Sequence, residues 1–96
     1  MNIEWALRGI ARGDKNSFST LYADQCAVLL RYATGLLAGD REAAADVVDE
    51  AFLDIWNQAG RFSGNGSAQG WLRRIVRNKA VDWIRKQRIR PVATAA

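Results

Sequence analysis

Three carboxylates stand close enough in the sequence to share one side of a helix. Asp46, Asp49 and Glu50 are spaced i, i+3, i+4, so their side chains would be neighbours. Such a group can act as acid and base or as metal ligands, but both roles need further ligands or a cleft. The 96-residue chain has no histidine and one cysteine, Cys26, so it lacks the commonest acid–base side chain and the usual zinc ligands. We therefore expect no enzyme, no metal site and no cofactor.

A binding partner explains these carboxylates better than acid–base chemistry or metal binding does. Like charges at this spacing repel one another, so a helix surface that keeps them is predicted to bind a basic molecule. Trp56, which follows the acids on the same helix, would be unusual on a surface that is only solvated. An ordinary acidic surface remains the alternative.

The charge of the chain is divided between its two parts, within a net charge of +4. Residues 1–60 hold five basic and nine acidic side chains, a balance of −4. Residues 61–96 hold nine basic side chains and a single acid, Asp82, a balance of +8. This division predicts two partners of opposite charge, and the dense basic part predicts a polyanion.

The basic part contains a helix, predicted to run from the cap Ser67 through Trp71 to about Arg88. One face of it would be Leu72, Ile75, Val76, Lys79, Ala80 and Trp83, and the other would be Arg74, Arg77, Asn78, Val81, Arg85 and Arg88. The second face suits a nucleic-acid backbone, and Asn78 could bond a base edge. A merely solvated face is the alternative, although such a face normally mixes charges of both signs.

A loop of turn-forming residues, 61–67, precedes this helix. Phe62 and Trp71 flank the loop, so aromatic surface, small polar side chains and positive charge occur together. Proteins hold single-stranded bases with this combination. The alternative is that the two aromatic side chains close the hydrophobic core around a turn.

The wider pattern predicts an all-α fold, a compact four-helix domain with a long basic C-terminal helix. Its helices are expected at Asn2 to Ala11, from Asp14–Ser17 to Gly39, from the cap Asp40 to Gly60, and from the cap Ser67 onward. The expected buried stripes are Phe18, Leu21, Tyr22, Leu29, Ala33, Leu36 and Leu37 in the second helix and Val48, Phe52, Ile55 and Ala59 in the third.

The chain reads as one domain, with Pro91 expected to end the last helix and a frayed tail after it. No apolar run approaches the ~20 residues that cross a bilayer. The first residues do not form a signal peptide. We therefore expect a cytoplasmic protein.

In sequence order, these segments resemble conserved region 2 of extracytoplasmic-function (ECF) sigma factors, of the sigma-70 family. The resemblance is carried by DVVDEAFLDIW at 46–56, by Arg61-Phe62, and by GWLRRIVRNKAVDWIR at 70–85. The segment from Gly13-Asp14 through Phe18, Leu21 and Tyr22 is similar to the start of the same region. Residues 1–90 would form the region 2 domain. Residues 91–96 would be a tail or the start of a linker toward the second helical domain, region 4, that family members normally carry.

The resemblance implies two binding surfaces. The acidic third helix would dock on the clamp helices of the β′ subunit of RNA polymerase, with Asp46, Asp49, Glu50, Leu53 and Trp56 as the polymerase-binding candidates. The loop and last helix would recognise and melt the −10 promoter element and hold a base flipped from the non-template strand. The DNA-binding candidates are Arg61, Phe62, Ser63, Asn65, Ser67, Trp71, Arg74, Arg77, Asn78 and Arg85. An anti-sigma factor is a further expected partner.

Two other classes remain open on the residues alone. A duplex-binding helix-turn-helix repressor would place a recognition helix in the major groove and usually dimerise, which the aromatic loop and acidic helix fit poorly. A pure interaction domain would use its basic face for an acidic protein. Preference for a palindromic half-site would favour the first, and indifference to DNA would favour the second.

Overall fold

The structure is a computed structural model that describes residues 1–88. It contains the helices α1 (Ile3–Ala11), α2 (Lys15–Leu36), α3 (Arg41–Gln58) and α4 (Ala68–Arg88), with a short 3₁₀ helix, η1 (Ala59–Arg61), after α3. No strand occurs within residues 1–88, so the predicted all-α, four-helix fold is confirmed. None of the helices in this part of the chain is long and apolar enough to cross a membrane. The expected stop at Pro91 and the tail lie outside the described residues.

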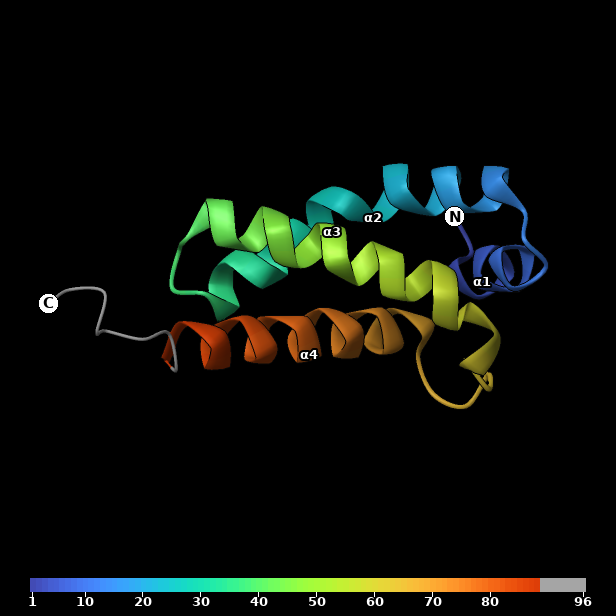
Figure 1. The fold of residues 1–96 in the computed structure, drawn as a ribbon. Coiled ribbons are helices and arrows are strands. Elements are labelled where there is room, and N and C mark those ends of the chain that lie inside the picture. Colours follow the sequence, from blue (N-terminus) through green and yellow to red (C-terminus); the bar gives the residue numbers. More distant parts are fainter. Residues whose placement is uncertain (89–96) are drawn as a thin grey trace, which may run out of the picture.

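The three long helices run antiparallel to one another in chain order (Figure 1). In this arrangement α3 packs against both α2 and α4, and α2 also contacts α4. The short helix α1 packs across the end at which α2 begins and α3 finishes, where it contacts η1 (Figure 1). The loop between α3 and α4 therefore lies at the same end of the bundle as α1.

The hydrophobic core lies between these helices. Its largest fully buried side chains are Leu7, Leu21, Leu29, Val47, Val48, Ile55, Leu72 and Val76. The predicted stripe of α3 is confirmed, because Val48, Phe52, Ile55 and Ala59 are all buried. The prediction that Tyr22 and Leu36 belong to the buried stripe of α2 was wrong, because Tyr22 is 41% exposed and Leu36 is 36% exposed. Tyr22 lies at the edge of the buried face against Phe52, and Leu37 takes the buried position at the end of α2.

A close approach fixes the junction between α1 and α2. A side chain at Gly9 would overlap the hydroxymethyl group of Ser17, so α1 needs glycine at this point. Asp14 caps α2 by accepting from the Asn16 N–H at 2.9 Å and from the Ser17 hydroxyl at 2.9 Å. The hydrogen bond from Ser17, followed by that from Asn16, holds the pKa of Asp14 below its ordinary value. The Asp14 N–H also donates to the Gly9 carbonyl at 2.9 Å, so the capping residue is joined directly to α1.

The turn between α2 and α3 is closed by backbone and side-chain hydrogen bonds. Gly39 N–H donates to the Thr34 carbonyl at 2.9 Å, and the chain turns through left-handed conformations at Ala38 (φ 55°) and Gly39 (φ 88°). Asp40 then accepts from the Ala43 N–H at 3.0 Å and caps α3, as predicted. This tight connection makes α3 antiparallel to α2.

Candidate protein and nucleic-acid interfaces

The loop between η1 and α4 is shaped by local hydrogen bonds. Ser67 Oγ accepts from the Gly70 N–H at 3.1 Å and so caps α4, as predicted. Ser63 Oγ accepts from the Asn65 N–H at 3.3 Å. Gly64 and Gly66 have φ of 85° and 80°, a region that other residues rarely adopt. The path of the loop therefore depends on its two glycines.

This loop and the first turn of α4 surround a pocket of about 300 Å³. The predicted DNA-binding residues that line it are Arg61, Phe62, Ser63, Asn65, Ser67, Trp71 and Arg74. The rings of Phe62 and Trp71 lie 5.7 Å apart, centroid to centroid, at an angle of 58°. Both are half-buried and pack against the core, so each closes the core on one side and lines the pocket on the other.

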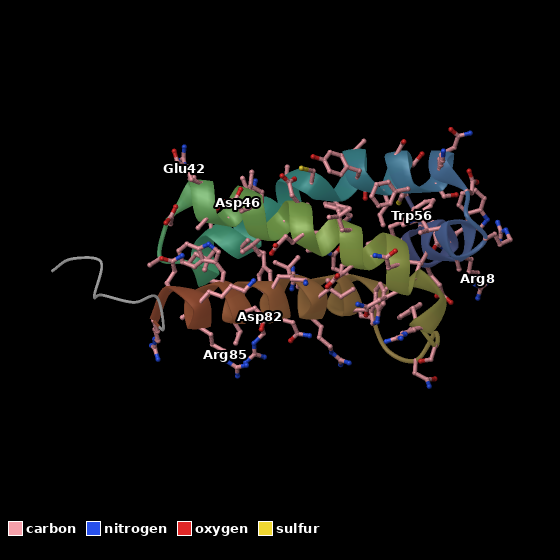
Figure 2. The ribbon with its side chains drawn as sticks, viewed as in Figure 1. Arg8, Glu42, Asp46, Trp56, Asp82 and Arg85 are labelled. Carbon is pink, nitrogen blue, oxygen red and sulfur yellow. The ribbon has the colours of Figure 1, made fainter. Side chains whose placement is uncertain are left out.

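The other three DNA-binding candidates continue along α4. Arg77, Asn78 and Arg85 are exposed on the same helical face as Arg74. Arg85 and Asp82 project from α4 on the side away from α3 (Figure 2). The structure therefore brings together a pocket and a basic ridge, with one acid, Asp82, on the exposed surface of α4.

The acidic residues of α3 lie on a different surface. Asp46, Asp49 and Glu50 are exposed, and within residues 1–88 none of the three forms an ion pair. Asp46 lies on α3, whereas Arg85 lies on the side of α4 that is away from α3 (Figure 2). Leu53, one turn beyond Asp49 and Glu50 on the helix, is 64% exposed. Four of the five polymerase-binding candidates thus form one exposed stripe on α3.

Comparison with known proteins identifies the family of the chain that carries these two surfaces. The Sigma-70 region 2 family matches residues 21–89, which is most of the chain. The chain belongs to the sigma-70 region 2 family. The family predicted from the sequence is confirmed, and it consists of transcription initiation factors and not of enzymes.

The curated relatives are RNA polymerase sigma factors. The chain is 40% identical over 57 residues to a probable RNA polymerase sigma factor, RfaY, of Xanthomonas campestris pv. campestris, covering 59% of this chain and 14% of that protein. It is 32% identical over 81 residues to the ECF RNA polymerase sigma factor SigM of Mycobacterium tuberculosis, covering 84% of this chain and 41% of the relative. It is 28% identical over 82 residues to the ECF sigma factor SigK of Mycobacterium ulcerans, covering 84% and 43%.

The chain therefore spans less than half the length of each of these relatives. No solved structure matches it.

In this region 2 domain, the end of α4 also reaches the acidic surface. Trp83 and Lys86 line a groove of about 320 Å³ together with Asp46, Asp49 and Glu50. Trp83 was expected on the core face, and neither residue was expected in a binding surface. Their i, i+3 spacing puts both on one edge of α4, but only the packing of α4 against α3 shows what that edge faces.

Trp56, the fifth polymerase-binding candidate, differs from the other four. It is half-buried, and its ring meets that of Phe18 edge to face, with centroids 5.4 Å apart. Phe18 in turn packs against Phe52 at 6.0 Å, and Tyr22 packs against Phe52 at 4.7 Å. Trp56 therefore borders the stripe of carboxylates through an aromatic cluster and offers only part of its surface to a partner.

Tyr22 joins this aromatic cluster to the acidic stripe. Hydrogen bonding to the Cys26 side chain raises the pKa of the Tyr22 hydroxyl, with smaller contributions from desolvation and from the charge of Asp49. Tyr22 is thus an exposed aromatic residue within reach of the charge of Asp49. Among residues 1–88 no three His, Cys, Asp or Glu side chains gather closely enough to hold a metal ion.

Proposed function

We propose that this region 2 domain links RNA polymerase to the −10 promoter element through two separate surfaces. The exposed stripe of α3, with Asp46, Asp49, Glu50 and Leu53 and the edge of Trp56, binds the clamp helices of the β′ subunit. The loop pocket and the basic face of α4 bind the non-template strand. Promoter opening follows from preferential binding of the open strand, without covalent chemistry.

The observation that carries this proposal is the loop pocket. It combines two aromatic rings, small hydroxyl and amide side chains, and arginines as its only charged residues. Aromatic rings stack on any unpaired base, and arginines beside them neutralise the phosphates of the same strand. Because Arg77 and Arg85 continue along α4, the strand has a basic path to follow beyond the pocket.

The energetics of base capture support the same proposal. Extruding a base from the duplex costs a few kcal/mol, and stacking on an aromatic side chain returns about 1–3 kcal/mol per base. The balance is close to zero, so base capture alone does not open the duplex. Backbone contacts along α4 and attachment to the polymerase then shift the population toward the open strand.

The α3 stripe suits a helical protein partner with basic and apolar side chains. Three carboxylates without ion pairs within residues 1–88 lie next to an exposed leucine on the same helix, so a partner can gain both charge contacts and apolar burial. The clamp helices of β′ are the proposed partner. An anti-sigma factor that covers the same residues would compete with the polymerase, and we propose it as the second protein partner.

The experiment is a pair of tryptophan substitutions measured by fluorescence anisotropy on single-stranded and duplex oligonucleotides. Trp71→Ala removes one wall of the pocket, and we expect single-strand affinity to fall about tenfold, as for the loss of one stacked base. Duplex affinity should change little, because phosphate contacts along α4 remain. Trp5→Ala is the matched control, since Trp5 is 63% exposed on α1 and lies outside the pocket lining.

Equal affinities of wild type and Trp71→Ala for the single strand would refute base capture in this pocket. Binding to duplex alone, with preference for a palindromic site, would instead indicate a helix-turn-helix repressor.

A further inference from the structure

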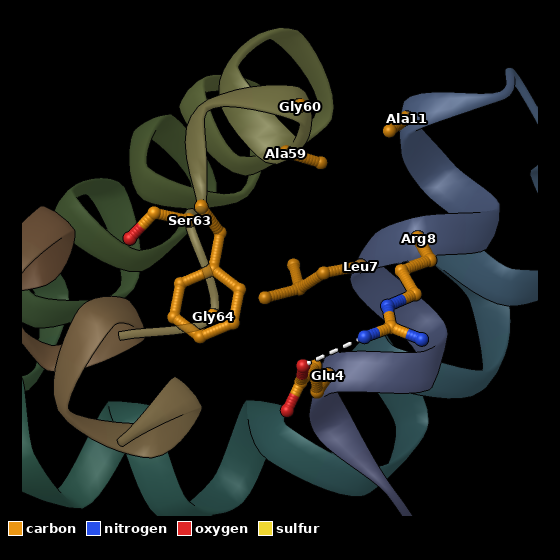
Figure 3. A pocket seen from close by; sticks show the side chains of 9 residues that line it. Glu4, Leu7, Arg8, Ala11, Ala59, Gly60, Ser63 and Gly64 are labelled. Carbon is orange, nitrogen blue, oxygen red and sulfur yellow. Dashed lines mark hydrogen bonds and ion pairs between the residues drawn. The ribbon is translucent and has the colours of Figure 1, made fainter. Parts of the chain in front are cut away.

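A second, smaller cavity lies behind the loop pocket, between α1 and the segment 59–64 (Figure 3). Its volume is about 150 Å³, and its apolar side chains are Leu7, Ala11, Ala59 and Phe62. Phe62 and Ser63 line both cavities, so they form the partition between them. A protein cavity of ~150 Å³ takes up a benzene ring. One six-membered ring, such as that of a pyrimidine, therefore fits this space.

The rim of this rear cavity carries a carboxylate. Arg8 Nη2 donates to Glu4 Oε1 at 3.0 Å, and both residues line the cavity (Figure 3). A Cβ atom at Gly64 would lie 3.6 Å from Glu4 Oε1, so the loop backbone passes directly beside the carboxylate. Glu4 is the only acidic residue that lines either cavity; the others that carry charge are Arg8, Arg61 and Arg74.

A carboxylate repels phosphates, so on a surface that binds a nucleic-acid strand it is expected to contact a base and not the backbone. It can instead accept a hydrogen bond from the exocyclic amino group of a base, as acidic side chains do with N4 of cytosine. Arg8, which only donates, suits the ring nitrogen or carbonyl next to that amino group. An i, i+4 ion pair also occurs on helices that bind nothing. Here the pair borders a ring-sized apolar cavity that shares an aromatic wall with the loop pocket.

We propose that the rear cavity is a second base site, which takes an unpaired cytosine of the same strand. Phe62 separates this base from the one in the loop pocket, and Glu4 selects cytosine over thymine by accepting from the amino group that thymine lacks. The inference depends on the proposed function, since it requires that the loop bind an unpaired strand. It assigns to α1 a role in base selection.

The test uses the full 96-residue chain and single-stranded oligo(dC) and oligo(dT) of about 12 nucleotides, a length within the usual site size. Wild type should bind oligo(dC) about fivefold more tightly than oligo(dT), as expected for one selective base contact. Glu4→Gln should bring this ratio to about one or invert it, because an amide can donate to a thymine carbonyl. Ala11→Leu fills the cavity from an exposed helix position and should also abolish the ratio.

Glu42→Gln is the matched control, with the same change of charge at an exposed site on α3 outside both cavity linings, and it should keep the wild-type ratio. Circular dichroism verifies that each variant folds. The second site is overturned if wild type shows no preference for oligo(dC), or if Glu4→Gln and Ala11→Leu both retain that preference. Failure of the proposed function has a different signature, because wild type would then bind neither single strand more tightly than duplex.

Discussion

The acidic surface of α3 and the basic surface of the loop and α4 are built in different ways. The α3 stripe consists of side chains on one regular helix, and its carboxylates stay exposed without ion pairs in the described part of the chain. The loop surface needs a pocket, which requires η1, two glycines at positive φ and the capped start of α4. A protein partner can dock on a surface of fixed charges, whereas an unpaired base needs a pocket with an aromatic ring on which it can stack.

One ion pair marks the boundary between the two surfaces. Asp54 lies on the same helix as the acidic stripe, but its carboxylate is turned toward α4, where Lys79 Nζ is 3.2 Å from Oδ2. Its charge is thus neutralised within the domain, while those of Asp46, Asp49 and Glu50 remain available to a partner. Position around the helix, and not acidity alone, decides which carboxylates can serve an interface.

The largest expected effect comes from reversing the charge of two carboxylates on α3, which tests this surface separately from the basic one. Asp49→Arg combined with Glu50→Arg should weaken binding to a β′ clamp-helix fragment at least about 100-fold, because two contacts become repulsive. The fold should be retained, since both side chains are exposed. Calorimetric titration measures the binding. Asp24→Arg with Asp82→Arg changes the net charge equally at exposed positions off α3 and should leave clamp binding intact. Full binding by the folded α3 variant would remove this stripe from the interface.

A smaller effect tests whether α3 acts through apolar contact as well as charge. Leu53→Ala should weaken clamp binding about fivefold to tenfold, as for a contact worth somewhat more than 1 kcal/mol. The free energy of unfolding should change by less than about 0.5 kcal/mol, because the side chain is already 64% exposed. Val28→Ala, at another exposed apolar position, serves as the control. An unchanged affinity in Leu53→Ala would show that the surface works by charge alone.

DNA binding by the basic surface should depend strongly on salt concentration, because it releases counterions from the phosphates. Arg77→Ala should weaken single-strand binding by a similar factor for all sequences and lower the slope of log affinity against log salt by about one. Arg31→Ala, an exposed arginine on α2, is the control and should keep the wild-type slope. Anisotropy titrations over a salt series measure both. An identical slope in Arg77→Ala would take this residue out of the DNA contact.

The smallest expected effect concerns the ion pair at the boundary. Lys79→Met should change the free energy of unfolding by about 0.5 kcal/mol or less, because both partners remain more than a quarter exposed. Chemical denaturation measures this, and binding to the clamp fragment should not change. A loss of about 3 kcal/mol, as for a buried pair, would show that Asp54 and Lys79 hold the two surfaces together.

The fold could be predicted from local signals to a large extent. Asp40 and Ser67 each cap the helix that they were expected to begin, and Asp14 caps α2 within its expected start, Asp14–Ser17, because N-cap hydrogen bonds depend on neighbouring residues alone. Tyr22 and Leu36 were misplaced because helical periodicity defines the centre of a buried face more sharply than its edges. Which edge positions are covered depends on the neighbouring helices.

The sites were predictable where one segment supplies them. The residues of the loop pocket lie within 14 positions of one another, from Arg61 to Arg74, so their types and spacing predicted an aromatic, basic site. The groove that joins Trp83 and Lys86 to the carboxylates of α3 combines two helices. The rear cavity combines α1 with the segment 59–64. No local pattern connects Glu4 to the loop, so its place beside the pocket emerges only from the packing of α1.

The central claim, that one domain carries a polymerase surface and a separate single-strand surface, is tested most directly by one anisotropy titration. Labelled single-stranded and duplex oligonucleotides are titrated with this chain at two salt concentrations, with and without the β′ clamp-helix fragment. We expect a preference for the single strand that weakens with salt and strengthens when the fragment is bound. Binding to duplex alone, unaffected by the fragment, would contradict the division of the domain into these two surfaces.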